Sequence, residues 1–119
     1  MKTLITLVTT LLFLFTFSAS AKADPMKGEE LFKKKCAACH NINDKAKVGP
    51  GLAGITKRHT DAWLTKWIAD PQAVWKENDK ETQELKSRMK DGAKRDKTKM
   101  KLKIDSNSIP DIIDYLKTL

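Results

Sequence analysis

Soft metal ligands are scarce in this chain, whose 119 residues include two cysteines and two histidines. A structural zinc site needs four ligands in tetrahedral geometry, so one site would use every Cys and His present. No helix-turn-helix or zinc-finger spacing occurs, which argues against nucleic acid as a partner. No segment alternates apolar and polar residues as a strand does, and no internal repeat is present. The sequence therefore predicts one small all-α domain.

Residues 1–23 have a different composition from the rest of the chain. Lys2 is followed by 19 uncharged residues with the apolar centre LITLVTTLLFLFTF, and alanines alternate toward the end of the segment. A basic start, an apolar run and an Ala-x-Ala site are typical of a secretory signal peptide. We expect cleavage after Ala23, or alternatively before Lys22, and a periplasmic mature domain of residues 24–119. An uncleaved leader would be just long enough to span a bilayer.

The mature domain is small, basic and short of large apolar side chains. Its 96 residues would bury only roughly 60–65% of their unfolded surface. Phe32 is the one phenylalanine outside the leader, so a bulky apolar cofactor would complete an otherwise small core. Without Lys2 and Lys22 the formal charge falls from +8 to +6. This charge favours acidic protein surfaces or anionic lipid as partners.

Helical patterns account for most of the mature domain. Asp24 and Pro25 are suited to open the first helix, and Pro71 is suited to end the second. The glycine-rich VGPGLAG between them indicates a loop. Pro110 is tolerated in the first turn of a final helix capped near Asn107 or Ser108. The apolar stripe of this helix is formed by Ile109, Ile112, Ile113 and Leu116. The predicted helices cover residues 24–40, 60–70, 80–90 and 107–119.

The stretch LFKKKCAACHNI contains both cysteines and one histidine within five consecutive residues. A thioredoxin-like dithiol would follow a strand in a βαβ pattern, and no strand is predicted here. A zinc site would need His59 as well, and His40 follows Cys39 too closely to complete the same tetrahedron easily. A disulfide between Cys36 and Cys39 would close a trivially short loop. These alternatives explain the motif less well than a covalently attached haem.

Haem attachment uses all three residues of the motif. On a helical turn, the sulfurs of Cys36 and Cys39 can reach the two vinyl edges of one porphyrin, and His40 then lies under the iron. Cys-x-x-Cys-His is the attachment signature of c-type haem, which is attached outside the cytoplasm, in agreement with an export signal. The other ring nitrogen of His40 needs an acceptor, and the carbonyl of Pro50 is suited to be it. Alternatively, Pro50 is an ordinary turn residue.

GEELFKKKCAACH, VGPGLAG, and Met100 followed by a helix ending in YLKTL together resemble a class I cytochrome c. The resemblance covers essentially the whole mature chain. It implies one haem wrapped by loops and helices, with the N- and C-terminal helices crossing closely. Gly28, Phe32 and Tyr115 occupy the matching positions, and Gly28 would permit the close approach.

The resemblance also implies a methionine as the second iron ligand, lying between the middle helices and the last one. Met26 precedes the haem motif by too few residues to fold over the opposite face. Met89 is four residues from Leu85, and a methionine on an apolar helical stripe is more often part of a core. Met100 lies in the extended KTKMKLK before the last helix. Met100 is therefore the predicted ligand, with Met89 as the alternative.

Lys101 and His59 both bear on the choice of Met100 as the ligand. The family usually has a proline directly after the ligand, and this chain has Lys101 there. His59, beside Arg58, is a remote third candidate, which we expect instead at the surface or near a haem propionate.

Positive charge is concentrated around Met100. From Lys86 to Lys103 there are nine lysines or arginines and two aspartates, a local net charge of +7. Such a run is commonly a solvated, mobile segment. It could equally border the exposed haem edge and steer an acidic partner into fast, weak encounters.

Taken together, these features predict a soluble single-haem carrier that moves one electron between redox proteins outside the cytoplasmic membrane. It would act as a monomer or in transient complexes and would not be an enzyme. One alternative is a haem enzyme or gas sensor with an open distal site. The other is a tightly held haem subunit of a larger redox complex.

Overall fold

The computed structural model describes residues 22–119, so the predicted signal peptide lies almost entirely outside the described residues. Within this range there is no β-strand, which confirms the all-α prediction. Over the same residues, no helix has the length and apolar character needed to cross a membrane. The helices are α1 (Pro25–Lys35), α2 (Ile55–Arg58), α3 (Asp61–Ala69), α4 (Pro71–Glu77), α5 (Lys80–Arg88), the 3-10 helices η1 (Gly92–Lys94) and η2 (Ser106–Ser108), and α6 (Ile109–Leu116).

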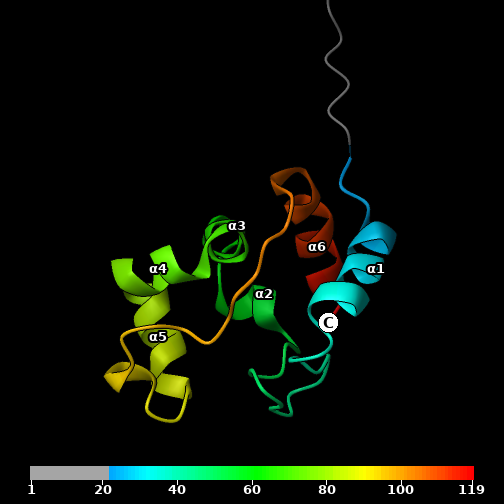
Figure 1. Ribbon diagram of the computed structural model, residues 1–119. Helices are drawn as coiled ribbons and strands as arrows, with labels where there is room; N and C mark the ends of the chain where they lie inside the picture. The colour runs from blue at the N-terminus through cyan, green and yellow to red at the C-terminus, as the bar shows by residue number, and fades with distance from the viewer. Residues whose placement is uncertain (1–21) are drawn as a thin grey trace, which may run out of the picture.

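The first and last helices pack against each other, side by side in Figure 1. The Asp24 side chain caps α1 by accepting from the backbone N–H of Met26. At the contact, a Cβ on Gly28 would lie 1.9 Å from the carbonyl oxygen of Asp111, so only glycine allows this approach. The rings of Phe32 and Tyr115 meet there with centroids 5.3 Å apart. The close crossing implied by the resemblance is confirmed.

Helix α1 ends earlier than the sequence predicts. The expected helix over residues 24–40 stops at Lys35, because the carbonyl of Phe32 accepts from the N–H groups of both Cys36 and Ala37. This shared acceptor interrupts the regular hydrogen-bond ladder. The haem motif therefore lies on tight turns that continue from the helix, rather than on the helix itself.

Three tryptophans connect α3 and α4 to later parts of the chain. The indole N–H of Trp63 donates to Thr82, that of Trp67 to the sulfur of Met100, and that of Trp75 to the carbonyl of Arg95. All three indole rings are buried with their N–H groups paired, as this side chain requires in a core.

The sequence does not predict helix α4, because the stretch after Pro71 is polar and a proline there indicates the end of a helix. Pro71 does follow the end of α3, yet it also occupies the first position of α4, where its missing N–H costs nothing. The Asp70 side chain caps this helix by accepting from the N–H of Ala73 at 3.0 Å. The apolar residues Val74 and Trp75 then reach the core.

Residues 96–104, which we call the strap, connect η1 to η2 and carry Met100. In Figure 1 the strap is the extended orange segment that runs from the α5 side of the molecule to the start of α6. The α6 stripe predicted from the sequence is buried, with Ile109, Ile112, Ile113 and Leu116 all in the core.

Candidate functional site

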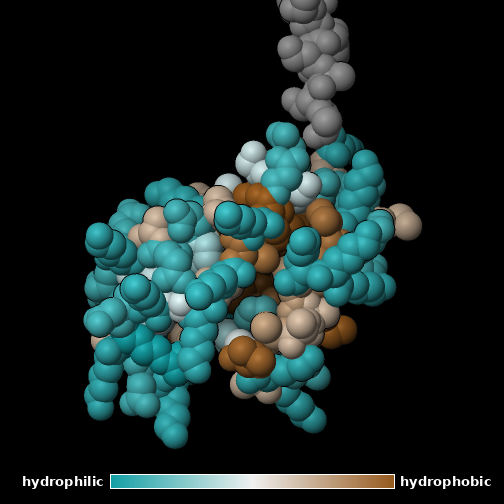
Figure 2. Space-filling model, viewed as in Figure 1, coloured by the Kyte–Doolittle hydropathy of each residue, from teal (hydrophilic) through white to brown (hydrophobic). Residues whose placement is uncertain are grey.

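A mainly apolar cavity of about 490 Å³ opens between α1, α3, α6 and the strap. Figure 2 shows apolar residues at the centre of this face, surrounded by hydrophilic ones. The volume is in the range of cavities that hold small molecules and cofactors. Both cysteines, His40 and Met100 line it, although they come from segments far apart in the sequence.

The two cysteines lie on the turns that follow α1. The carbonyl of Cys36 accepts from the N–H of Cys39 at 3.1 Å and from that of His40 at 3.0 Å, which keeps the motif compact. Both thiols are free. Burial, with a smaller contribution from Cys39, raises the pKa of the Cys36 thiol to about 11. Reactive redox dithiols have a lowered pKa, so this environment is the opposite of theirs.

A zinc site finds no support in the described residues. Between residues 22 and 119, no group of three or more His, Cys, Asp or Glu side chains is arranged to hold a metal ion. The second histidine, His59, is engaged with Glu81 rather than with the cysteines.

The ring of His40 is oriented by the glycine-rich loop. Its Nδ1 lies 2.8 Å from the carbonyl oxygen of Pro50, so this nitrogen can donate a hydrogen bond. The opposite nitrogen, Nε2, then keeps a lone pair that is free to bind a metal. A Cβ on Gly49 would lie 2.3 Å from the imidazole, so glycine is needed for the loop to pass this close. Such an arrangement is typical of a histidine that ligates a metal, because the second-shell acceptor fixes the ring.

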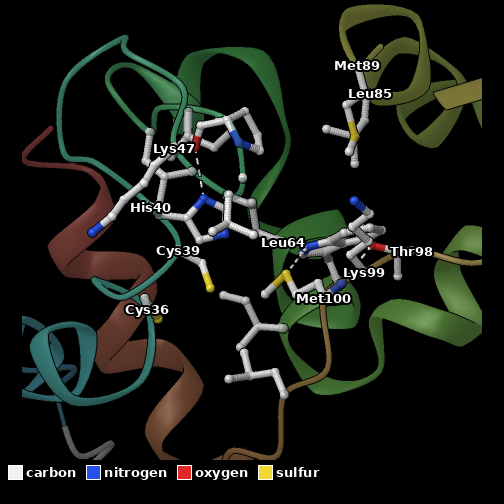
Figure 3. A pocket seen from close by; sticks show the side chains of 18 of the residues that line it. Cys36, Cys39, His40, Lys47, Leu64, Leu85, Met89, Thr98, Lys99 and Met100 are labelled. Atoms are coloured by element: carbon white, nitrogen blue, oxygen red, sulfur yellow. Dashed lines mark hydrogen bonds between the residues drawn. The ribbon is translucent and has the colours of Figure 1, made fainter. Parts of the chain in front are cut away.

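Met100 lines the cavity from the strap. Figure 3 shows its sulfur turned toward the same space as the His40 ring and the Cys39 sulfur. The indole N–H of Trp67 donates to this sulfur at 3.1 Å. Met89 also borders the cavity, but in Figure 3 it lies beside Leu85 of α5. Since a thioether sulfur has two lone pairs, one can accept from Trp67 while the other stays available to a metal.

Of the two positions expected for His59, the surface is wrong, and the position near a haem propionate stays a prediction. This side chain is 3% exposed and stacks on Trp63, with ring centroids 4.2 Å apart. Its Nδ1 lies 3.2 Å from Oε2 of Glu81, which also accepts from the N–H of Thr60, while Oε1 accepts from the Thr60 hydroxyl. Burial lowers the pKa of His59, and the carboxylate only partly opposes this effect. His59 is therefore a neutral wall of the cavity at pH 7.

The basic run predicted around Met100 borders the cavity. Five of its side chains line the opening, joined by two lysines from the haem-motif side of the molecule. The exposed hydrophilic rim in Figure 2 surrounds the apolar centre. The seven basic residues are Arg88, Lys90, Arg95, Lys99, Lys101, Lys35 and Lys47.

Sequence reasoning missed two residues that contact Met100. The sequence does not identify Trp67 of α3 as a partner of the sulfur, and it does not single out Gln72 of α4. Neither has a local signal, because both contacts join residues 28 or 33 positions apart.

The residues present fit a covalently held haem. The cavity is mainly apolar, two free thiols line it, and an oriented imidazole and a thioether face the same space. Imidazole and thioether are the ligand pair of cytochromes c.

Comparison with known proteins agrees with this fit. The Cytochrome c family profile matches residues 25–119. The chain is 45% identical over 47 residues to cytochrome c of Ginkgo biloba, covering 38% of this chain and 42% of that protein. It is 57% identical over 37 residues to cytochrome c2 iso-1 of Rhodospirillum centenum, covering 29% and 30%. The aligned part thus spans less than half the length of these curated relatives.

Solved structures extend the likeness to most of the chain. Cytochrome c from Rhodothermus marinus matches with a TM-score of 0.61 and 22% identity, over 79% of this chain and 74% of that one, which establishes the shared fold. Cytochrome c2 from Rhodospirillum centenum matches with a TM-score of 0.57 and 27% identity, over 81% and 98%. The chain belongs to the cytochrome c family, as a class I cytochrome with one covalently attached haem c.

Proposed function

We propose that the protein is a one-electron carrier that acts between redox proteins outside the cytoplasmic membrane. The observation that carries this proposal is the shared cavity, which an oriented histidine and a methionine face together. When bound there, haem supplies a one-electron couple at its iron. The composition of residues 1–23 supports export to the periplasm.

Each site residue has a distinct role in this proposal. Cys36 and Cys39 would hold the macrocycle through thioether bonds, and His40 would ligate iron through Nε2 while the Pro50 carbonyl fixes its ring. Met100 ligates from the strap. A Met/His ligand pair favours the ferrous state and raises the reduction potential. The packed residues around the cavity would limit how far these groups move when the iron changes between its ferrous and ferric states.

If His40 and Met100 both ligate the iron, haem would offer no open position to a substrate, so the protein would not be an enzyme. The alternative, an enzyme or gas sensor with an open distal site, requires that neither Met100 nor Met89 binds iron. The hydrogen bond from Trp67 to the Met100 sulfur favours the carrier, because it holds the sulfur at the cavity wall.

Absorption spectroscopy of the protein purified from the periplasmic fraction tests the proposal. The ferric protein is expected to show the weak red charge-transfer band of methionine–iron ligation, and the ferrous protein should not bind carbon monoxide readily. A high-spin ferric spectrum with rapid ligand binding would contradict the carrier role. Absence of the haem protein from the periplasmic fraction would contradict the proposed location.

The basic rim supports a partner with an acidic docking surface. Positive charge around the cavity opening would attract such a surface and speed its association. The other alternative, a permanent subunit of a larger complex, would use the same rim as a fixed interface. Size-exclusion chromatography of a native extract separates the two, since a free carrier elutes near its own small mass.

Oxidation by two small reagents of opposite charge measures the effect of the rim. We expect oxidation of the ferrous protein by ferricyanide to slow as ionic strength rises, because salt screens its attraction to the rim. Oxidation by the cationic tris(phenanthroline)cobalt(III) should instead become faster. Stopped-flow absorbance gives both rates. Equal salt dependence for the two oxidants would show that the rim does not steer reactants.

A further inference from the structure

The strap that carries Met100 has few restraints of its own. Among residues 22–119, no hydrogen bond between backbone groups involves residues 96–104, and the strap has no helical turn. Lys101 follows the methionine, so no proline ring fixes the backbone there. A second hollow of about 1020 Å³ lies along the strap, bordered by Thr98, Met100 and Leu102, which also line the main cavity. The strap therefore separates the main cavity from the second hollow, and part of it borders both.

One side chain of α4 supplies the missing backbone restraint. The amide nitrogen of Gln72 donates to the carbonyl of Thr98 at 2.7 Å and to the carbonyl of Met100 at 3.2 Å. The hydroxyl of Thr98, a residue 6% exposed, accepts from the N–H of Met100 at 3.1 Å. Both backbone polar groups of Met100 are thus bonded, and Gln72 connects the carbonyl to a capped helix.

Apart from this amide, a single hydrogen bond reaches the strap from elsewhere in the described chain, from the Trp67 indole to the Met100 sulfur. The two contacts act on different parts of the residue. Trp67 contacts the ligating atom itself, whereas Gln72 holds only the main chain. A change at Gln72 therefore alters the position of the strap without altering the group that donates to sulfur.

We propose that Gln72 is a positioning residue that keeps the strap closed over the haem cavity, so that the Met100 sulfur stays on the iron. This inference rests on the proposed ligation by Met100. An external ligand can reach the iron only after the thioether leaves, so the rate of strap opening limits its binding. Gln72 reduces the fraction of time that the strap is open.

The test compares cyanide binding to the ferric holoprotein in matched variants. Gln72→Leu removes both donors, and Gln72→Glu removes them with little change of shape. Gln83→Leu is the control, because Gln83 of α5 also donates its side-chain amide to a backbone carbonyl, that of Asn78 at 2.9 Å, which is not part of the strap. We expect both Gln72 variants to bind cyanide about ten- to a hundred-fold faster than wild type, as the loss of two hydrogen bonds implies. The control should change the rate less than about two-fold, since its amide is exposed and makes a bond of small net value.

A second readout follows the ligation directly. In both Gln72 variants the red methionine–iron band should disappear at a lower temperature than in wild type, while far-ultraviolet circular dichroism still reports folded helices. Cyanide rates at Gln72 equal to those of Gln83→Leu, in a protein with the wild-type band, would overturn this inference and leave the carrier function intact. A wild-type protein without the band would overturn both.

Discussion

Replacing Met100 with alanine is expected to abolish the methionine–iron band and open the distal side to ligands, while haem stays attached. The cysteines and His40 lie on the turns after α1 and do not depend on the strap for their geometry. Removal of the thioether should leave the iron with a vacant or water-filled position, since Met100 presents its sulfur to the same space as the His40 ring in Figure 3. The ferric spectrum should become high-spin, and carbon monoxide should bind the ferrous form completely.

The reduction potential of this variant should also fall. A thioether stabilises the ferrous state, so its loss favours the ferric state. Redox titration against dyes of known potential measures the shift, and the wild-type protein under the same conditions is the reference.

Met89→Ala is the matched control, because Met89 also borders the cavity and the substitution removes an identical thioether there. Met89 is partly buried against the core, so alanine there should lower stability moderately and leave the band in place. If the band survives in Met100→Ala and is lost in Met89→Ala, the ligand assignment is wrong and α5 supplies the methionine.

Replacing Gly28 with alanine is expected to cost about 2–3 kcal/mol of the free energy of unfolding, opposite in sign to the usual effect in a helix. In a helix interior, alanine is normally more stable than glycine by about 1 kcal/mol. Here the added Cβ would lie 1.9 Å from the Asp111 carbonyl oxygen and 3.0 Å from the nitrogen of Ile112. Backbone atoms cannot rotate away, so α1 and α6 must separate and the core between them must loosen.

Thermal unfolding of the holoprotein, followed by circular dichroism, checks this prediction. The midpoint should fall by roughly 10 °C or more, given the usual scale for a domain of this size. Lys27→Ala is the control, since this neighbouring position in α1 is exposed and should change the midpoint little. A Gly28→Ala protein as stable as wild type would mean that the two helices do not cross this closely in solution.

Met100 and Gln72 have different roles, because Met100 supplies the ligand and Gln72 holds the chain that carries it. Met100→Ala removes the atom that binds iron, whereas Gln72→Leu leaves that atom in place and loosens the chain that presents it. The first change should eliminate the band at every temperature. The second should keep the band at low temperature and lose it on warming.

The sequence by itself determined the features that depend on short spacing. The positions of Cys36, Cys39 and His40 within five residues predicted the attachment motif, and the structure places all three at one cavity. The apolar stripe of α6 and the cap of α1 were predicted correctly for the same reason. Residues this close in the chain are held at known separations by the backbone itself, so their pattern carries the geometry.

Tertiary structure alone decided the features that join distant residues. The burial of His59 against Trp63 and Glu81 reversed a surface assignment, since the residues next to it in the chain, Arg58 and Thr60, are polar and suggest an exposed position. The contacts of Trp67 and Gln72 with Met100 span 33 and 28 positions. No local pattern encodes such pairs, because they exist only when several packed helices bring the strap beside α3 and α4.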